Sequence, residues 1–151
     1  QVEGRWPAPG GELVTGGSPR YNVYRTKDGK FVAAAPLEDK FWKNFCALIG
    51  LAAEFEDDRR DPQATKAAVA KIIASRTAEQ WRPVFAAADC CVTIMATLEE
   101  ALRDPHFIGR GLFQYRVAGP SGATMPALPV PVAPQFRGDS AVANAAPKLS
   151  E

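Results

Sequence analysis

The chain has 151 residues, 46% of them hydrophobic, which is enough to bury the core of an ordinary folded domain. Its 18 Lys and Arg against 17 Asp and Glu give a formal net charge of +1, which excludes the strongly basic composition of a dedicated nucleic-acid-binding protein. No stretch reaches the ~20 apolar residues of a membrane-spanning helix, so we expect a cytoplasmic protein without a membrane span.

The first part of the sequence predicts a connector followed by a β-hairpin. Residues 1–18 carry too many prolines and glycines for a regular element and indicate a connector. Residues 21–25 favour a strand, residues 27–29 supply a turn that ends in glycine, and residues 30–35 form a second apolar run. This order of strand, turn and strand is typical of a hairpin.

Two helices are predicted after the hairpin. Apolar residues at helical spacing predict a helix over residues 38–49, and Gly50 is expected to end it. An aspartate followed by proline predicts the start of a second helix over residues 62–75. The cluster at residues 54–61 between them is predicted to be too charged to bury.

A third helix is predicted to begin at Thr77. Thr77 and Gln80 have the spacing of a capping box, in which each side chain bonds the other residue's backbone. Trp81 and Phe85 then lie four residues apart on one helix face. Pro83 lacks a backbone donor and its ring clashes with the preceding turn, so we expect it to kink or end this helix.

The next segment predicts further short elements. Residues 90–95 form an apolar, partly β-branched run that indicates a buried strand. A second capping-box pattern at residues 97–100 predicts a short helix to about residue 103, and the aspartate and proline at 104–105 repeat the signal for a helix start. Residues 113–118 predict another strand.

The C-terminal part is predicted to be irregular. Residues 119–122 are typical of a turn, and the four prolines between there and Phe136 argue against a helix or a central strand. After Gly138 the composition becomes small and polar, which predicts a poorly tethered tail.

These elements together predict an α+β fold. We expect a small mixed domain with a β-hairpin, several helices and further short strands, flanked by extended Pro/Gly-rich connectors. The expected boundaries are a connector at 1–18, the small α+β domain at 19–118, and an extended proline-rich return segment and tail at 119–151.

Few residues are candidates for chemistry. The only histidine, His106, has no visible partner, so a solvent-facing or capping role is favoured over proton transfer. Cys46, Cys90 and Cys91 match neither a disulfide framework nor the spacing of a zinc site, so we expect buried free thiols and no metal. The common catalytic motifs are absent from the sequence.

Two further features have both a functional and a purely structural interpretation. Gly16 and Gly17 would let the backbone approach a phosphate or thioester, but by themselves they favour a flexible connector. Glu38 lies at a predicted helix start, where an acid most often compensates the helix dipole.

The stretch GGSPRYNVYRTKDGKFVAAAPLEDKFW, residues 16–42, closely resembles the hairpin and following helix of the class III CoA-transferase (CaiB/BaiF) family, on its α-methylacyl-CoA racemase-like branch. WRPVFAAADCCVT at 81–93 and LEEALRDPHFIGRGLF at 98–113 agree in the same order. The resemblance covers roughly residues 13–150. Because the family's enzymes are considerably longer, it implies a small domain whose large domain lies outside this chain.

The resemblance implies an enzyme that acts on acyl-CoA thioesters as substrates, without a tightly bound cofactor. The racemase branch exchanges the proton α to the thioester carbonyl with an Asp and a His, which lie in the large domain and match no residue here. Glu38 matches the L-E-x-x-F pattern of that branch, where the acid orients the catalytic histidine across the domain cleft. We therefore expect the parent to be active, as an interlocked homodimer, and the isolated chain to be inactive.

Alternatives remain open within and outside the family. Transferases of the family form covalent intermediates on an aspartate, and their formyl-CoA branch has a longer glycine-rich loop where this chain has only Gly16 and Gly17. The short loop favours the racemase over a CoA-transferase. A non-catalytic CoA-binding or interaction domain is the third possibility, which residual CoA binding by the isolated chain would favour.

Overall fold

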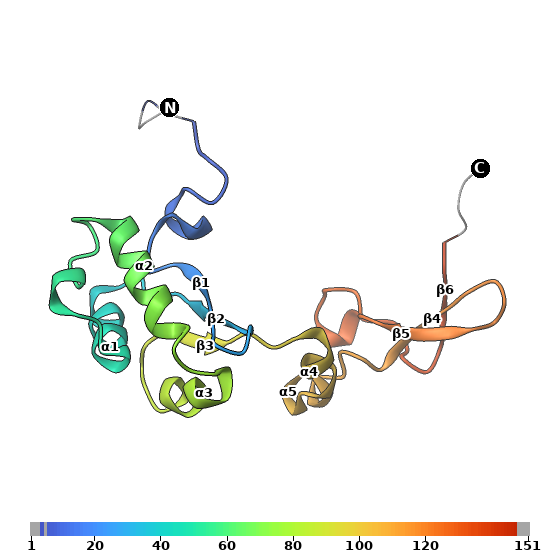
Figure 1. The fold of residues 1–151 in the computed structure, drawn as a ribbon. Helices are drawn as coiled ribbons and strands as arrows, with labels where there is room; N and C mark the ends of the chain where they lie inside the picture. The colour runs from blue at the N-terminus through green and yellow to red at the C-terminus, as the bar shows by residue number, and fades with distance from the viewer. Residues whose placement is uncertain (1–3, 5, 148–151) are drawn as a thin grey trace. The chain divides into compact units, whose positions relative to one another are not determined.

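The computed structural model describes residues 4 and 6–147, and the chain divides between Met95 and Ala96 into two compact units (Figure 1). Each unit contains helices and a three-stranded sheet, so the predicted α+β class is confirmed. The domain expected at 19–118 extends across the boundary between the units.

The first unit contains most of the predicted elements. In chain order these are η1 (Leu13–Gly17), β1 (Asn22–Arg25), β2 (Phe31–Ala34), α1 (Asp39–Ile49), η2 (Ala53–Phe55), α2 (Pro62–Ile73), α3 (Ala78–Ala86) and β3 (Val92–Ile94). The hairpin, the three helices and the strand after them are all confirmed, with bounds shifted by a few residues. The turn η1 falls inside the segment that was predicted to be too rich in glycine for a regular element.

The sheet of the first unit is antiparallel, with the order β1-β2-β3. Tyr24, Val32 and Ile94 lie opposite one another across the three strands and are buried. Neighbouring residues in each strand point the other way, and Val23 and Phe31 are exposed. The sheet therefore has one face in the core and one exposed face.

The core of the first unit is formed where this face meets the helices. α1 contributes Trp42, Phe45, Cys46 and Ile49, α2 contributes Val69 and Ile73, and α3 contributes Trp81 and Phe85. Their spacing is that of one face of each helix, as the sequence predicts. Burial of this apolar surface is the main source of stability for the unit.

The tip of the hairpin is bound to the start of α3. The Asp28 carboxylate accepts hydrogen bonds from the Thr26 hydroxyl (2.6 Å) and from the backbone N–H of Ala78 (3.0 Å). The Lys27 N–H donates to the carbonyl of Arg76 at 2.9 Å. The hydrogen bond from Thr26 is the main cause that lowers the pKa of Asp28. These bonds join two segments that are distant in sequence.

Helix α3 begins as predicted but does not end at Pro83. Thr77 and Gln80 form the expected capping box, with both reciprocal bonds present. The helix continues through Pro83 to Ala86, so Pro83 does not end it there, and the kink expected at this residue stays a prediction. Only three residues of the helix follow the proline, so α3 ends within one turn of the bond that Pro83 cannot donate to the Glu79 carbonyl.

The second unit is built from α4 (Leu98–Arg103), α5 (Pro105–Gly109), β4 (Tyr115–Ala118), β5 (Thr124–Ala127), η3 (Pro134–Phe136) and β6 (Asn144–Ala145). The capping box at Thr97 and Glu100 is present, and Asp104 caps α5 through the N–H of His106. Both helix starts were predicted from these residues.

The segment after residue 119 is more ordered than predicted. β5 pairs with β4 in antiparallel fashion and includes Pro126, which is compatible with pairing because β5 is an edge strand. Pro134 begins the short helix η3, so the expected absence of helix was also wrong. β6 lies parallel to β4 on its other side, and Ala146 N–H donates to Ala118 at 2.8 Å, so the described part of the tail is tethered.

The three cysteines are free thiols, but they are not all buried. Cys46 and Cys90 lie in the core, and burial raises the pKa of both, that of Cys46 to about 12. Cys91 is exposed, and its backbone adopts a left-handed conformation, with φ of 51°, just before β3. Within the described residues, no helix is long and apolar enough to cross a membrane.

Candidate functional site

Gly16 lies in the tight turn η1 rather than in a flexible connector. Its φ of 104° is a conformation that side chains other than glycine rarely adopt. Its carbonyl oxygen accepts hydrogen bonds from the Asn22 side chain at the start of β1 (3.1 Å) and from the Lys66 ammonium on α2 (3.2 Å). The turn is therefore fixed to both the hairpin and α2.

Gly17 is required for a different reason, which is the close approach of two backbone segments. Its N–H donates to the Glu12 carbonyl at 2.9 Å, which closes the turn. A Cβ at this position would lie 2.8 Å from that same oxygen and would clash directly with the carbonyl group of Gly11. These contacts make Gly16 and Gly17 part of an ordered turn, and their role as a substrate loop stays a prediction.

Gly17→Ala is therefore expected to open this turn. We expect a loss of about 1–3 kcal/mol in the free energy of unfolding, the usual cost of forcing an atom into occupied space. Denaturant unfolding measures it, and faster hydrogen exchange at the Gly17 amide would localise it. Gly138→Ala is the matched control, because a Cβ at Gly138 meets no atom within 4 Å. Equal stability of the two variants would contradict the close approach seen at Gly17.

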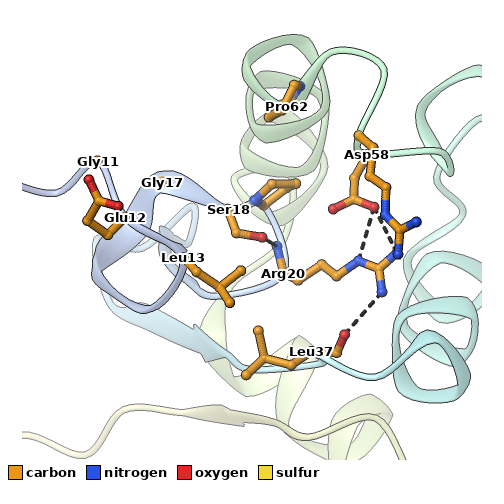
Figure 2. Close-up of a pocket in the computed structure, with 11 residues that line it drawn as sticks. Gly11, Glu12, Leu13, Gly17, Ser18, Arg20, Leu37, Asp58 and Pro62 are labelled. Atoms are coloured by element: carbon orange, nitrogen blue, oxygen red, sulfur yellow. Dashed lines mark hydrogen bonds and ion pairs between the residues drawn. The ribbon is translucent and has the colours of Figure 1, made fainter. Parts of the chain in front are cut away.

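A cavity of about 510 Å³ lies beside this turn (Figure 2). Its walls are the η1 turn, the segment before β1, Leu37 in the segment between β2 and α1, and the loop before α2. The lining residues are Gly11, Glu12, Leu13, Gly17, Ser18, Pro19, Arg20, Leu37, Asp58, Arg59 and Pro62. Gly17 and Leu37, the residue before Glu38, thus line one cavity.

The charged pair of this cavity is Arg20 with Asp58 (Figure 2). The Arg20 Nε and Nη2 groups both donate to Asp58 Oδ1, at 3.0 and 2.8 Å. The two side chains are only 12% and 8% exposed. Asp58 is thus buried, although its charged segment was predicted to remain outside the core, because Arg20 compensates its charge.

Arg20 also holds the end of the hairpin. Its Nη1 group donates to the Leu37 carbonyl at 3.1 Å and to Asp39 Oδ1 at 2.6 Å. Its guanidinium carbon lies 5.3 Å from the centre of the Trp42 ring, in a cation–π contact. Burial lowers the pKa of Arg20, but the hydrogen bonds and charges of Asp58 and Asp39 outweigh it, so the pKa is raised overall.

Neither Arg20 nor Asp58 is predicted from the sequence. They are far apart along the chain, and Asp58 is one of five acidic residues in EFEDDRRD with no local feature that sets it apart. A buried pair of this kind depends on tertiary contacts, which hydrophobic periodicity does not reveal. The pair therefore adds two residues to the candidate site.

Glu38 occupies the N-cap position of α1, but its side chain makes no capping bond. Its backbone carbonyl accepts from the N–H of Trp42 at 3.0 Å, and its side chain is exposed. Among the interactions of residues 4 and 6–147, none involves the Glu38 carboxylate. The structure therefore leaves this carboxylate accessible to a partner outside the described residues.

A second hollow of about 470 Å³ is lined in part by other residues of the η1 turn. It is lined by Val14, Thr15, Gly16, Tyr21, Asn22, Val23, Ala33, Ala34 and Ala35. Its walls are mainly apolar side chains and backbone. Gly16 and Gly17 thus line different hollows, and Glu38 lines neither, although it directly follows Leu37.

His106 lies in the second unit and is exposed. Its backbone N–H donates to the Asp104 carboxylate at 2.8 Å, and its ring contacts the edge of Phe107 with centres 5.5 Å apart. His106 therefore lies in the first turn of α5 and is exposed to solvent, whereas Asp104 makes the capping bond. Among the described residues, no three His, Cys, Asp or Glu side chains form a group that could hold a metal.

Comparison with known proteins agrees with the resemblance noted in the sequence. Residues 2–151 match the model of CoA-transferase family III. Human alpha-methylacyl-CoA racemase is 31% identical over 141 residues, which is 89% of this chain and 37% of the human protein. The mouse alpha-methylacyl-CoA racemase is 33% identical over 117 residues, which is 75% of this chain and 31% of the mouse protein.

Solved structures share the fold. The crystal structure of Rv3272 from Mycobacterium tuberculosis in an orthorhombic form aligns with a TM-score of 0.60 and 22% identity. The alignment covers 85% of this chain and 37% of that one. The chain thus spans about a third of the length of the curated relatives described above.

Proposed function

Because the chain belongs to CoA-transferase family III, we propose that it forms the small domain of an enzyme that acts on acyl-CoA thioesters. The reaction we propose is exchange of the proton α to the thioester carbonyl of a 2-methylacyl-CoA. Similarity to curated racemases over most of the chain carries this proposal.

The chemistry requires groups that this chain does not supply alone. An α-proton beside a thioester is removed only when a base lies against it and the developing enolate oxygen is stabilised. We propose that an Asp and a His elsewhere in the parent protein perform the proton transfers. In this proposal Glu38 accepts a hydrogen bond from the His and fixes its tautomer and orientation.

The position of Glu38 supports this role. An exposed carboxylate without a partner among the described residues, next to a cavity wall, is available to an imidazole from another part of the protein. Its side chain makes no capping bond, so within the described residues the helix dipole is the local interaction left to this carboxylate. We assign the acyl-CoA itself as substrate, with no tightly bound cofactor.

The reaction is tested on the parent protein with a 2-methylacyl-CoA in deuterated water. Deuterium incorporation at the α-carbon with inversion of configuration is the expected result. Transfer of CoA to a free carboxylate acceptor, without exchange, would instead favour the CoA-transferase of the same family. Binding of CoA without either reaction would favour a non-catalytic domain. The isolated 151-residue chain is expected to show no turnover.

Glu38→Gln in the parent protein is expected to lower kcat by roughly 10-fold or more, because the amide no longer provides the negative charge that stabilises an imidazolium. KM and thermal stability are expected to change little, since the side chain has no partner among the described residues. Steady-state exchange kinetics measure this effect. Glu54→Gln, the same change at an exposed glutamate of η2, is the control. Equal activity of both variants would restrict Glu38 to a role at the helix start.

Three further properties belong to this proposal and rest on the family alone. The parent is expected to contain a large domain, to form an interlocked homodimer, and to be cytoplasmic. The size of the parent in solution, measured by light scattering, tests the dimer.

A further inference from the structure

Arg20 bonds the chain on both sides of Glu38. One nitrogen, Nη1, donates to the carbonyl of Leu37 and to the carboxylate of Asp39. We propose that Arg20 is a positioning residue that fixes the direction of the Glu38 side chain. This inference rests on the proposed function of Glu38 and extends it to a second residue.

The guanidinium is itself held rigidly, which a positioning residue requires. Its other two nitrogens, Nε and Nη2, are both bonded to Asp58, and its face contacts the ring of Trp42. Near the backbone, the Arg20 N–H donates to the Ser18 hydroxyl at 3.1 Å. Nη1 therefore acts as a donor fixed in place by Asp58, which lies outside the segment around Glu38, and by Trp42 in the first turn of α1.

That segment has two other backbone bonds besides those within α1: the Leu37 N–H donates to the Ala35 carbonyl at 2.8 Å, and the Glu38 carbonyl accepts from the N–H of Trp42. Glu38 has an extended backbone, with φ of −75° and ψ of 144°, between the end of the hairpin and the first turn of α1. Its side chain makes no bond that would fix its conformation. Bonds to Leu37 and Asp39 fix the backbone around Glu38 and leave the carboxylate free for a partner. Loss of such positioning lowers the rate of a reaction even when every reacting group is present.

Only an arginine can make this set of bonds. The planar guanidinium directs two nitrogens toward Asp58 and the third toward residues 37–39 at the same time, whereas a lysine has a single nitrogen. Arg20→Lys should therefore keep the charge opposite Asp58 and lose the bonds beside Glu38. It is a milder change than Arg20→Met, which would leave Asp58 buried without a counter-charge.

The experiment is a double-mutant cycle in the parent protein with Arg20→Lys, Glu38→Gln and the combined variant. Arg20→Lys is expected to lower kcat for α-proton exchange by about 5-fold with KM unchanged. Combined with Glu38→Gln, it should cause almost no further loss, because its effect passes through Glu38. Lys40→Met is the matched control. Lys40 is a neighbouring cation whose bond to Asp89 is exposed, and its removal should leave kcat unchanged.

Asp39→Ala provides a second variant in case Arg20→Lys fails to fold. Asp39 is 67% exposed and contacts Arg20 through Nη1 alone, so the fold does not depend on it. Asp39→Ala should lower kcat by a smaller factor than Arg20→Lys. It should cause almost no further loss when it is combined with Glu38→Gln.

The outcomes separate this inference from the proposed function. If Glu38→Gln has no effect on kcat, the proposed role of Glu38 fails first. If Glu38→Gln lowers kcat but the losses from Arg20→Lys and Glu38→Gln simply multiply, Glu38 keeps its role and the positioning by Arg20 is overturned. The positioning role is also overturned if the lower kcat of Arg20→Lys is explained entirely by a smaller fraction of folded protein.

Discussion

Trp81→Ala is expected to reduce the stability of the first unit by about 4 kcal/mol, within the usual range for removing a large buried aromatic side chain. Trp81 is 1% exposed, and its ring stacks on Phe85 with centres 5.2 Å apart. Its Nε1–H donates to the Ile73 carbonyl at 2.9 Å, and the Arg76 guanidinium lies 4.7 Å from the ring centre. The substitution leaves a cavity and removes all three contacts.

Denaturant unfolding followed by circular dichroism measures this loss. Trp6→Ala is a control with the same chemistry, because Trp6 is 90% exposed and should contribute almost nothing. A loss below about 1 kcal/mol for Trp81→Ala would show that α3 is not part of the core.

Asp58→Ala is expected to destabilise the first unit by about 3 kcal/mol, because it leaves the Arg20 guanidinium buried without its main partner. The expected loss is at the lower end of the range for broken buried pairs, since Arg20 keeps its bonds to Leu37 and Asp39. Asp57→Ala, at the exposed neighbouring position, should cost less than about 0.5 kcal/mol. Both variants replace an aspartate by alanine. The difference between their urea midpoints therefore reflects where the aspartate lies and not which residue type is removed.

The pair can be tested further by replacing both members. Arg20→Met combined with Asp58→Leu removes both charges together and should recover part of the loss from Asp58→Ala, because no buried charge remains unpaired. A double variant less stable than Asp58→Ala would mean that the bonds of Arg20 to residues 37–39 matter more for stability than its bond to Asp58.

The elements with strong local signals were predictable from the sequence. The hairpin turn with its glycine, the capping boxes at Thr77 and Thr97, and the apolar spacing of α1 each depend on residues within one or two turns of chain. Helix propensities and capping bonds act over this range, so these elements can be predicted from the sequence. The family resemblance adds the interpretation of Glu38, which local patterns leave as a helix-start acid.

The elements that depend on distant partners were not predictable. β5 and β6 become strands only because β4 lies beside them, and Pro126 is acceptable only because β5 is at the edge of that sheet. Burial of Asp58 depends on Arg20, and the need for glycine at position 17 depends on the path of the chain at Gly11. In each case the deciding contact is tertiary, and composition alone does not reveal it.

The order of strands in the first unit also determines when that unit can fold during synthesis. β1 and β2 form a local hairpin, but Val32 receives its second neighbour, Ile94, only after α1, α2 and α3 have been made. A nascent chain that has not yet emerged from the ribosome past β3 therefore has an unpaired edge on β2 and an incomplete core. Such edges pair readily with other chains. Emergence of residues 92–94 from the ribosome is thus the step that covers the second edge of β2.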